Sequence, residues 1–280
     1  MGCQHAIAGF ELEKRSSAGV PMKSATKTKK PPTEEQGAQV NGAMPLYDAP
    51  QAVHSVTHRE ISVRTGEGSF SFAEKAPIIE VTVDEFERAA LDFPIVFVGE
   101  SLQPFVIMGL EADQNQFVSA GSYRPGVYVP AYLRRHPFVF ARDEGSDALI
   151  LCLDHASDRV VKAGDTGAMP LFDGGEPTAL TRQALQFCEN YEAARARTLV
   201  LIGLLRELDL LEARQATRAG AEGEDATLLL EYQTIDVAKL DALDPDGFQR
   251  LRAAGALPAI YAQLASQANW QVLAVTRPAA

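Results

Sequence analysis

The sequence predicts an α+β protein: an antiparallel sheet or partial barrel over residues 55–161, then one long helix and a small helical C-terminal part. Three observations support this class. Short alternating or β-branched segments crowd the first half, one long amphipathic pattern follows them, and proline and aspartate mark further helix starts near the end. Strands so close in sequence favour antiparallel hairpins, because parallel strands need long crossover connections.

The first 43 residues are expected to form a disordered leader. Residues 16–41 are rich in Lys, Thr, Pro, Glu, Gln and Gly and contain almost no large apolar side chain, so they have little surface to bury. One domain is expected from residue 44 to residue 280, a length sufficient for a full hydrophobic core.

The expected strands begin after this leader. A short helix should interrupt them after residue 82, because Thr82 and Glu85 have the spacing of a capping box and Phe86 and Ala89 give the helix an apolar side. Pro94 ends it. The strands themselves are predicted at residues 60–64, 69–72, 78–83, 95–98, 105–110, 116–119, 148–153 and 159–161.

The second half of the sequence changes to a helical period. Spacings of four and three predict one helix over residues 178–213, with an apolar face that is wide enough to pack within a monomer. The same repeat leaves a coiled-coil seam, and therefore a homodimer, as an alternative. The repeating residues are Leu180, Ala184, Phe187, Tyr191, Ala194, Thr198, Leu201, Leu205 and Leu208.

The remaining chain reads as a polar loop, a strand and short helices. Residues 215–225 are predicted to be the loop and residues 228–235 the strand. Asp236 and Asp244 are expected to cap helical turns, and a last helix is expected over residues 258–267. Residues 270–275 form a final apolar segment.

Composition excludes several classes of function. The chain holds 26 basic and 37 acidic residues, and six of the basic and four of the acidic ones precede residue 44, so the rest has a net charge of −13. An acidic body repels nucleic acid and anionic membranes. The longest apolar run, residues 199–205, is far shorter than the roughly 20 residues of a membrane span. With no secretory signal pattern at the start, a cytoplasmic location is expected.

Motifs for cofactor chemistry are missing from the sequence. Neither phosphate-binding glycine pattern nor a nucleophile elbow occurs, so no cofactor is predicted. The three cysteines are too widely spaced for a disulfide framework or a zinc knuckle. An alternative is a metal-dependent, oxygenase-like enzyme acting on a peptide, with His54 and His58 as ligands and Asp154, or the nearby His155 or Asp158, completing the site.

Residues 128–138, Tyr-Val-Pro-Ala-Tyr-Leu-Arg-Arg-His-Pro-Phe, are the strongest candidate site. Arg134, Arg135 and His136 stand between two prolines and among large apolar residues. Such arginines are either structural, satisfying nearby carbonyls and carboxylates, or part of an anion or peptide-carboxylate site. In the second case Tyr123, Tyr128 and Tyr132 form the walls.

Five segments together identify a family. They are His58; residues 93–97; residues 121–123 with 128–138; residues 167–175; and residues 260–266. This set resembles the SapC family of bacterial surface-layer-associated proteins over residues 44–275. The family usually has Trp in place of Tyr123 and often Tyr in place of His136, which bears on the shape of the pocket.

The resemblance implies an association with bacterial surface layers, and in many relatives with outer-membrane receptor systems. It carries over no catalytic residue. Combined with the arginine pair, it leads us to expect a non-catalytic binding or accessory protein for a cell-surface or nutrient-uptake system. Its partners would be a peptide or other anionic ligand and components of such a receptor.

Overall fold

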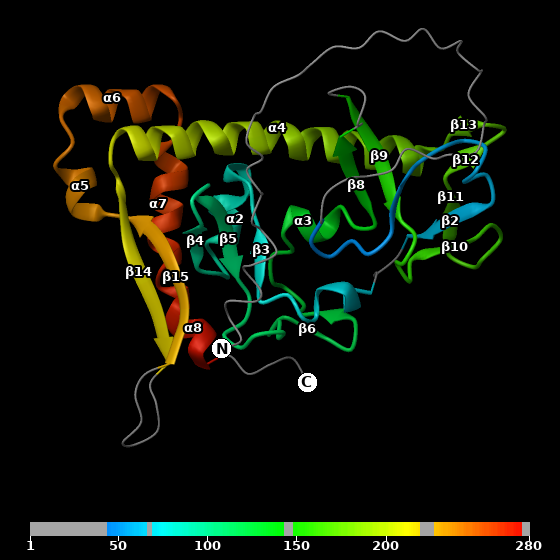
Figure 1. The fold of residues 1–280 in the computed structure, drawn as a ribbon, viewed down its shortest axis with the longest axis horizontal. Coiled ribbons are helices and arrows are strands. Elements are labelled where there is room, and N and C mark those ends of the chain that lie inside the picture. The colour runs from blue at the N-terminus through cyan, green and yellow to red at the C-terminus, as the bar shows by residue number, and fades with distance from the viewer. Residues whose placement is uncertain (1–43, 66–68, 143–147, 219–226, 276–280) are drawn as a thin grey trace, which may run out of the picture.

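The structure is a computed structural model that describes residues 44–65, 69–142, 148–218 and 227–275. In this part of the chain the predicted α+β class is confirmed: antiparallel sheets, one long helix and a small helical C-terminal part (Figure 1). The predicted leader, residues 1–43, lies outside the described residues. No helix within the described ranges combines the length and apolar character that crossing a bilayer requires.

The largest sheet has five antiparallel strands in the order β14-β15-β4-β5-β3. Its centre is the most buried part of the molecule, because every residue of β4 and four of the five residues of β5 are buried. The strands are β3 (Ile78–Glu80), β4 (Ile95–Val98), β5 (Gln103–Ile107), β14 (Leu211–Arg218) and β15 (Thr227–Ile235).

In the described ranges four smaller sheets hold the other strands, so residues 55–161 do not form one continuous sheet. The predicted strand at residues 69–72 is wrong, because Ser71–Ala73 forms the 3-10 helix η2. The first three-stranded sheet has β1 (Pro50–Ala52), β9 (Leu149–Asp154) and β8 (Phe138–Arg142); the second has β10 (Val160–Lys162), β2 (Ile61–Arg64) and β11 (Ala168–Pro170). The two-stranded sheets are β6 (Val118–Ser119) with β7 (Ser122–Tyr123), and β12 (Phe172–Asp173) with β13 (Glu176–Pro177).

The long helix α4 (Ala179–Glu207) connects the two parts of the core. Thr178 caps its start, and its predicted apolar face is buried at Tyr191, Thr198 and Leu201. Leu201 belongs to the larger core cluster, around the five-stranded sheet, whereas Cys188 packs in a second cluster around β2, β8 and β9. The helix therefore serves as an intramolecular scaffold, and it runs across the upper part of the molecule in Figure 1.

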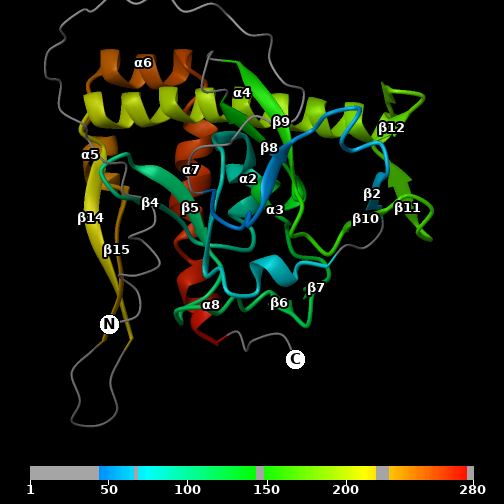
Figure 2. The same ribbon diagram turned by 45° about the vertical axis from the view of Figure 1, so that its right-hand side comes forward.

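The predicted end of this helix is wrong. The helix ends at Glu207, and Asp209 has a φ of 50°, a left-handed conformation that an α-helix does not contain. Residues 211–216 are good helix formers, but eight residues of β14 pair with β15, and this tertiary pairing overrides the local preference. The predicted loop at residues 215–225 therefore starts too early. Figure 2 shows the two strands descending from the end of α4.

Short helices follow β15 up to the end of the described residues, and α7 (Leu257–Ser266) packs against β15 and β4 of the five-stranded sheet. Gln263 of α7 donates from Nε2 to the carbonyl of Ile95, and Ser266 Oγ accepts from the amide of Ile95, so this helix pairs with both backbone groups of the first residue of β4. Asp236 and Asp244 cap helices as predicted. The helices are α5 (Val237–Asp241), α6 (Pro245–Ala253), α7 (Leu257–Ser266) and α8 (Asn269–Val275).

Candidate functional site

The candidate segment, residues 128–138, is anchored by one buried carboxylate. Glu85 ends the 3-10 helix η3 (Val83–Glu85), just before α2 (Phe86–Ala89), and is 5% exposed. Its Oε2 accepts from the amide and the hydroxyl of Thr82, both at 2.9 Å, which is the predicted capping box. Its Oε1 accepts from the Ala131 amide at 2.6 Å and from the Tyr128 hydroxyl at 3.0 Å. The same side chain therefore caps one helix and holds the start of α3 (Ala131–Arg134).

Tyr128 is fixed from three sides. Its amide donates to Asp92 at 2.8 Å, and its carbonyl accepts from the hydroxyl of Tyr123 at 2.6 Å. Burial, with the charge of Glu85 as a second cause, raises the pKa of Tyr128 to about 12, so the hydroxyl stays a neutral donor. Tyr123 therefore supports the segment from inside, and its hydroxyl is used within the protein.

Arg135 lies in a cage of tyrosine rings. Its guanidinium carbon is 4.1 Å from the ring centroid of Tyr132, 4.4 Å from that of Tyr191 and 5.5 Å from that of Tyr47. Its Nε donates to the hydroxyl of Tyr47 at 3.2 Å. Within the described ranges no carboxylate lies within ion-pair distance of Arg135, although the half-buried Glu80 contributes at longer range. The cage is held by cation–π attraction and packing.

The hydroxyls of the cage are all directed inward. Tyr47 donates to the Phe138 carbonyl at 3.0 Å and Tyr132 to the Pro45 carbonyl at 2.7 Å. Tyr191 donates to Glu80 at 3.1 Å. The predicted wall residue Tyr132 is thus a wall of this internal cage, and Tyr47 and Tyr191 are walls that the sequence reasoning missed. Tyr191 was visible in the sequence as part of the buried helix face, but nothing linked it to Arg135.

Arg134 has the opposite environment, although it is the next residue. Its side chain is exposed, and its guanidinium carbon is 5.7 Å from the ring centroid of Tyr128 and 5.4 Å from that of Phe187 on α4. Its Nε donates to the Val129 carbonyl at 3.0 Å, and Nη2 donates to the Tyr128 hydroxyl at 3.2 Å. Among the described residues no carboxylate forms an ion pair with it, so donors of this guanidinium face solvent.

His136 lies inside the protein and cannot share a surface site with Arg134. It is 3% exposed, and its ring stacks on Phe72 with centroids 3.7 Å apart. Its Nε2 is 3.5 Å from Oδ2 of Asp154, and its Nδ1 has no hydrogen-bond partner among the residues that the structure describes. Burial lowers the pKa of His136 to about 4, so the imidazole is neutral at physiological pH.

The residues of the metal alternative are engaged elsewhere. Asp154 accepts from the amides of Asp48, Ala49 and Ala156, at distances from 2.8 to 3.2 Å. His58 directs Nδ1 to the backbone of His54 and Nε2 to the ring of His155, not to Asp154. No group of three or more His, Cys, Asp or Glu side chains in the described ranges is placed to hold a metal ion.

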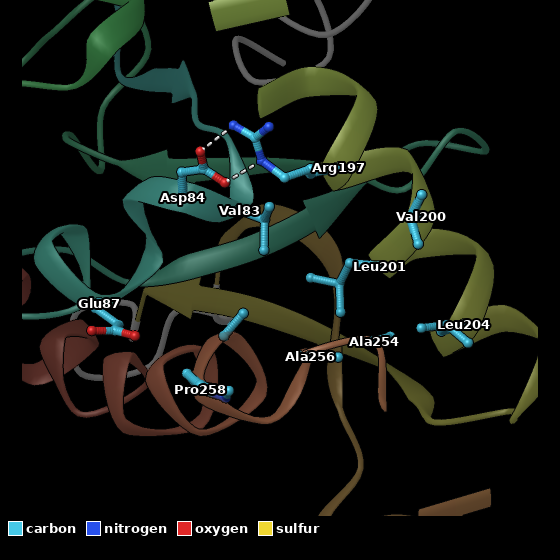
Figure 3. A pocket seen from close by; sticks show the side chains of 12 residues that line it. Val83, Asp84, Glu87, Arg197, Val200, Leu201, Leu204, Ala254, Ala256 and Pro258 are labelled. Atoms are coloured by element: carbon cyan, nitrogen blue, oxygen red, sulfur yellow. Dashed lines mark hydrogen bonds and ion pairs between the residues drawn. The ribbon is translucent and has the colours of Figure 1, made fainter. Parts of the chain in front are cut away.

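A separate pocket of about 320 Å³ lies away from the arginine segment. It opens between η3, α2, α4 and the turn from α6 to α7, and nothing in the sequence pointed to it. Figure 3 shows the ion pair of Arg197 with Asp84, with contacts of 3.0 and 2.5 Å, beside Val83. Leu201 and Pro258 belong to its apolar walls. The pocket is a mainly apolar hollow with a charged rim.

Comparison with known proteins assigns the chain to a family. No curated protein and no solved structure matches the chain. A family model does match: the model of the SapC family covers residues 53–273, which is most of the chain and includes the whole of residues 128–138. The chain is therefore a member of the SapC family.

Proposed function

We propose that this protein is a non-catalytic binding or accessory protein of a bacterial cell-surface or nutrient-uptake system, and that Arg134 receives an anionic group of its ligand. The ligand class that fits is a peptide or another molecule with a carboxylate. Membership of the SapC family, with the surface-layer association that its resemblance implies, supports the cellular setting.

The exposed guanidinium of Arg134 is the observation that carries this proposal. It is an arginine with two internal hydrogen bonds and two flanking rings, yet no ion-pair partner among the described residues. These contacts restrain the side chain before any ligand arrives, which lowers the entropy cost of binding. A restrained guanidinium is well suited to a carboxylate, because its fork of donors matches the two oxygens.

Arg135 gives the segment its rigidity. The rings around Arg135 are those of Tyr132 on α3, Tyr191 on α4 and Tyr47, which precedes β1. These contacts hold the helical turn that presents Arg134 against the rest of the protein. The two arginines therefore have separate roles: Arg134 meets the ligand and Arg135 positions it.

The net negative charge of the protein limits the places on its surface where an anion can bind. Outside residues 1–43 the chain has 20 basic and 33 acidic residues, so an anion meets repulsion over much of the surface. A local group of donors is then required for binding. The rings of Tyr128 and Phe187 beside Arg134 would contact the apolar part of the ligand.

A titration with fluorescein-labelled tetraglutamate, followed by fluorescence anisotropy, tests the proposal. Wild-type protein should bind tetraglutamate more tightly than labelled tetraglutamine, and more tightly at low salt than at high salt. Arg134→Gln should weaken binding about tenfold, the loss expected for one charge-assisted contact. Arg88→Gln, which removes another exposed arginine, is the matched control and should change nothing. Equal affinity of wild type and Arg134→Gln, or no binding by wild type, would show the proposal to be wrong.

A further inference from the structure

The pocket between η3, α2, α4 and the turn from α6 to α7 is a second place where a ligand fits. Its volume of about 320 Å³ lies at the lower end of the range that small-molecule sites occupy. Two apolar side chains of α4 are left open to it: Val200 is 61% exposed and Leu204 is half-buried. A ligand that covers them removes apolar surface from water, which is favourable. The pocket therefore favours a ligand with an apolar part.

Hydrogen bonds fix the walls of this pocket before a ligand arrives. The amide of Val83 donates to Thr198 Oγ1 at 2.9 Å, which joins η3 to α4. At the turn between α6 and α7, the Ala256 amide donates to the Leu251 carbonyl at 3.0 Å. Binding therefore requires little rearrangement of the protein, which lowers its entropy cost.

Three charged side chains line the pocket, and one of them lacks a charged partner among the described residues. Arg197 donates from Nε and Nη2 to the two carboxylate oxygens of Asp84, at 3.0 and 2.5 Å, so these two charges balance each other. Glu87 is exposed, and no ion pair within the described ranges includes it. Two carboxylates and one guanidinium leave one negative charge in the pocket, and that charge is on Glu87.

Glu87 and the open apolar side chains lie at different sides of the pocket. In Figure 3 Glu87 is at the left, Val200 and Leu204 are at the right, and Pro258 lies between them. A molecule that fills the pocket therefore meets a carboxylate at one end and apolar groups at the other. A carboxylate only accepts hydrogen bonds, and it binds a protonated amine more strongly than a neutral donor.

We propose that this pocket binds an amphiphilic ammonium compound, with its apolar chain against Val200 and Leu204 and its protonated amine at Glu87. The charge of the whole chain favours such a ligand, because the 33 acidic and 20 basic residues outside residues 1–43 attract cations toward the surface. The site is independent of the anion site proposed at Arg134. It selects the opposite charge, and none of residues 128–138 lines it.

Methyl NMR of the full chain, titrated with hexylammonium chloride at neutral pH, tests this proposal. Saturable shifts should appear at the methyl groups of Val200, Leu201 and Leu204, which line the pocket. Hexan-1-ol has the same chain without the charge, and hexanoate has the opposite charge. Hexylammonium should bind about threefold more tightly than hexan-1-ol, and this difference should shrink at high salt, because an exposed ion pair is weak and screened. Absence of saturable shifts at these methyl groups, or tighter binding of hexanoate, would overturn the proposal.

Two substitutions, each with a matched control, test the two parts of the pocket. Glu87→Gln should weaken hexylammonium binding about threefold and leave hexan-1-ol unchanged. Glu189→Gln, which removes an exposed carboxylate of α4 outside the pocket, should change neither. Ala254→Phe should direct a ring into the pocket from an exposed position and weaken both ligands at least tenfold, whereas Ala253→Phe, next to it but outside the pocket, should match wild type. Unchanged hexylammonium affinity in Glu87→Gln would contradict the proposal, and this variant decides the question if Ala254→Phe does not fold.

Discussion

Glu85 combines two structural tasks in one carboxylate. Four donors converge on it: two from Thr82, one from Tyr128 and one from Ala131. Hydrogen bonds to a charged group are stronger than those between neutral groups, and the bond from the Ala131 amide joins η3 directly to the start of α3. Glu85 therefore links the capping box to the candidate site. The sequence predicted the capping box but not this link.

Replacing this carboxylate by an amide tests its role. In Glu85→Gln one oxygen becomes an NH2 group that faces donors, so at least two hydrogen bonds are lost in a buried place. We expect the free energy of unfolding to fall by about 2–4 kcal/mol. Glu87→Gln, the exposed carboxylate two residues later, should change it by less than about 0.5 kcal/mol. Urea denaturation of both variants provides the comparison, and equal effects would refute the role of Glu85.

His136 should make stability depend on pH. Its pKa is about 4 in the folded protein and 6.5 in the unfolded chain, so between these values the unfolded chain binds more protons. Stability is complete above pH 6.5 and decreases as the pH falls toward 4. From pH 7 to pH 5 the loss from this residue should be about 2 kcal/mol. His136→Asn should lose correspondingly less over the same interval in urea denaturation, whereas a parallel loss in both proteins would contradict the assignment.

At the scale of the element, α4 separates buried from exposed leucines. Leu201 is 4% exposed and packs in the larger core cluster, whereas Leu199 is 62% exposed. Leu201→Ala should lower the free energy of unfolding by about 2–5 kcal/mol, the usual range for a buried leucine. Leu199→Ala, the same change on the same helix, should be close to neutral. Urea denaturation of the two variants measures both free energies of unfolding. An unchanged free energy in Leu201→Ala would mean that Leu201 lies at a surface instead.

The helices and strands show which sequence signals are sufficient to predict an element. The period of α4 and the caps Thr82, Asp236 and Asp244 are local, so they predicted correctly where these helices start. The strand β14 is different, because its sequence suits a helix and its state depends on pairing with β15. The division of strands among five sheets likewise depends on contacts between distant residues, which no local pattern encodes.

The sequence indicated where the candidate segment lies along the chain, but it did not indicate how the side chains of that segment are arranged. Residues 128–138 stand out in the sequence as the candidate segment. Which arginine is enclosed by tyrosine rings depends on Tyr47 and Tyr191, which come from distant parts of the chain. The pairing of His58 with His155 is equally non-local. Spacing along the chain suggested His54 as a partner instead.

At the scale of the whole molecule, the acidic body and the tyrosine cage explain why the two arginines are expected to differ in function. The cage fixes α3 against α4, and the negative charge of the body leaves few places where an anion is attracted. Binding and stability should therefore depend on different residues of the same dipeptide. This separation is the central claim about the protein.

The most direct test measures two properties of two variants, Arg134→Lys and Arg135→Lys. Both keep the charge and lose the planar fork of donors. We predict that Arg135→Lys lowers the free energy of unfolding by about 1–3 kcal/mol, because the contacts of the guanidinium with three tyrosine rings are weakened. Arg134→Lys should unfold like wild type but bind labelled tetraglutamate more weakly. Loss of stability in both variants, or wild-type behaviour of both in unfolding and binding, would contradict the account.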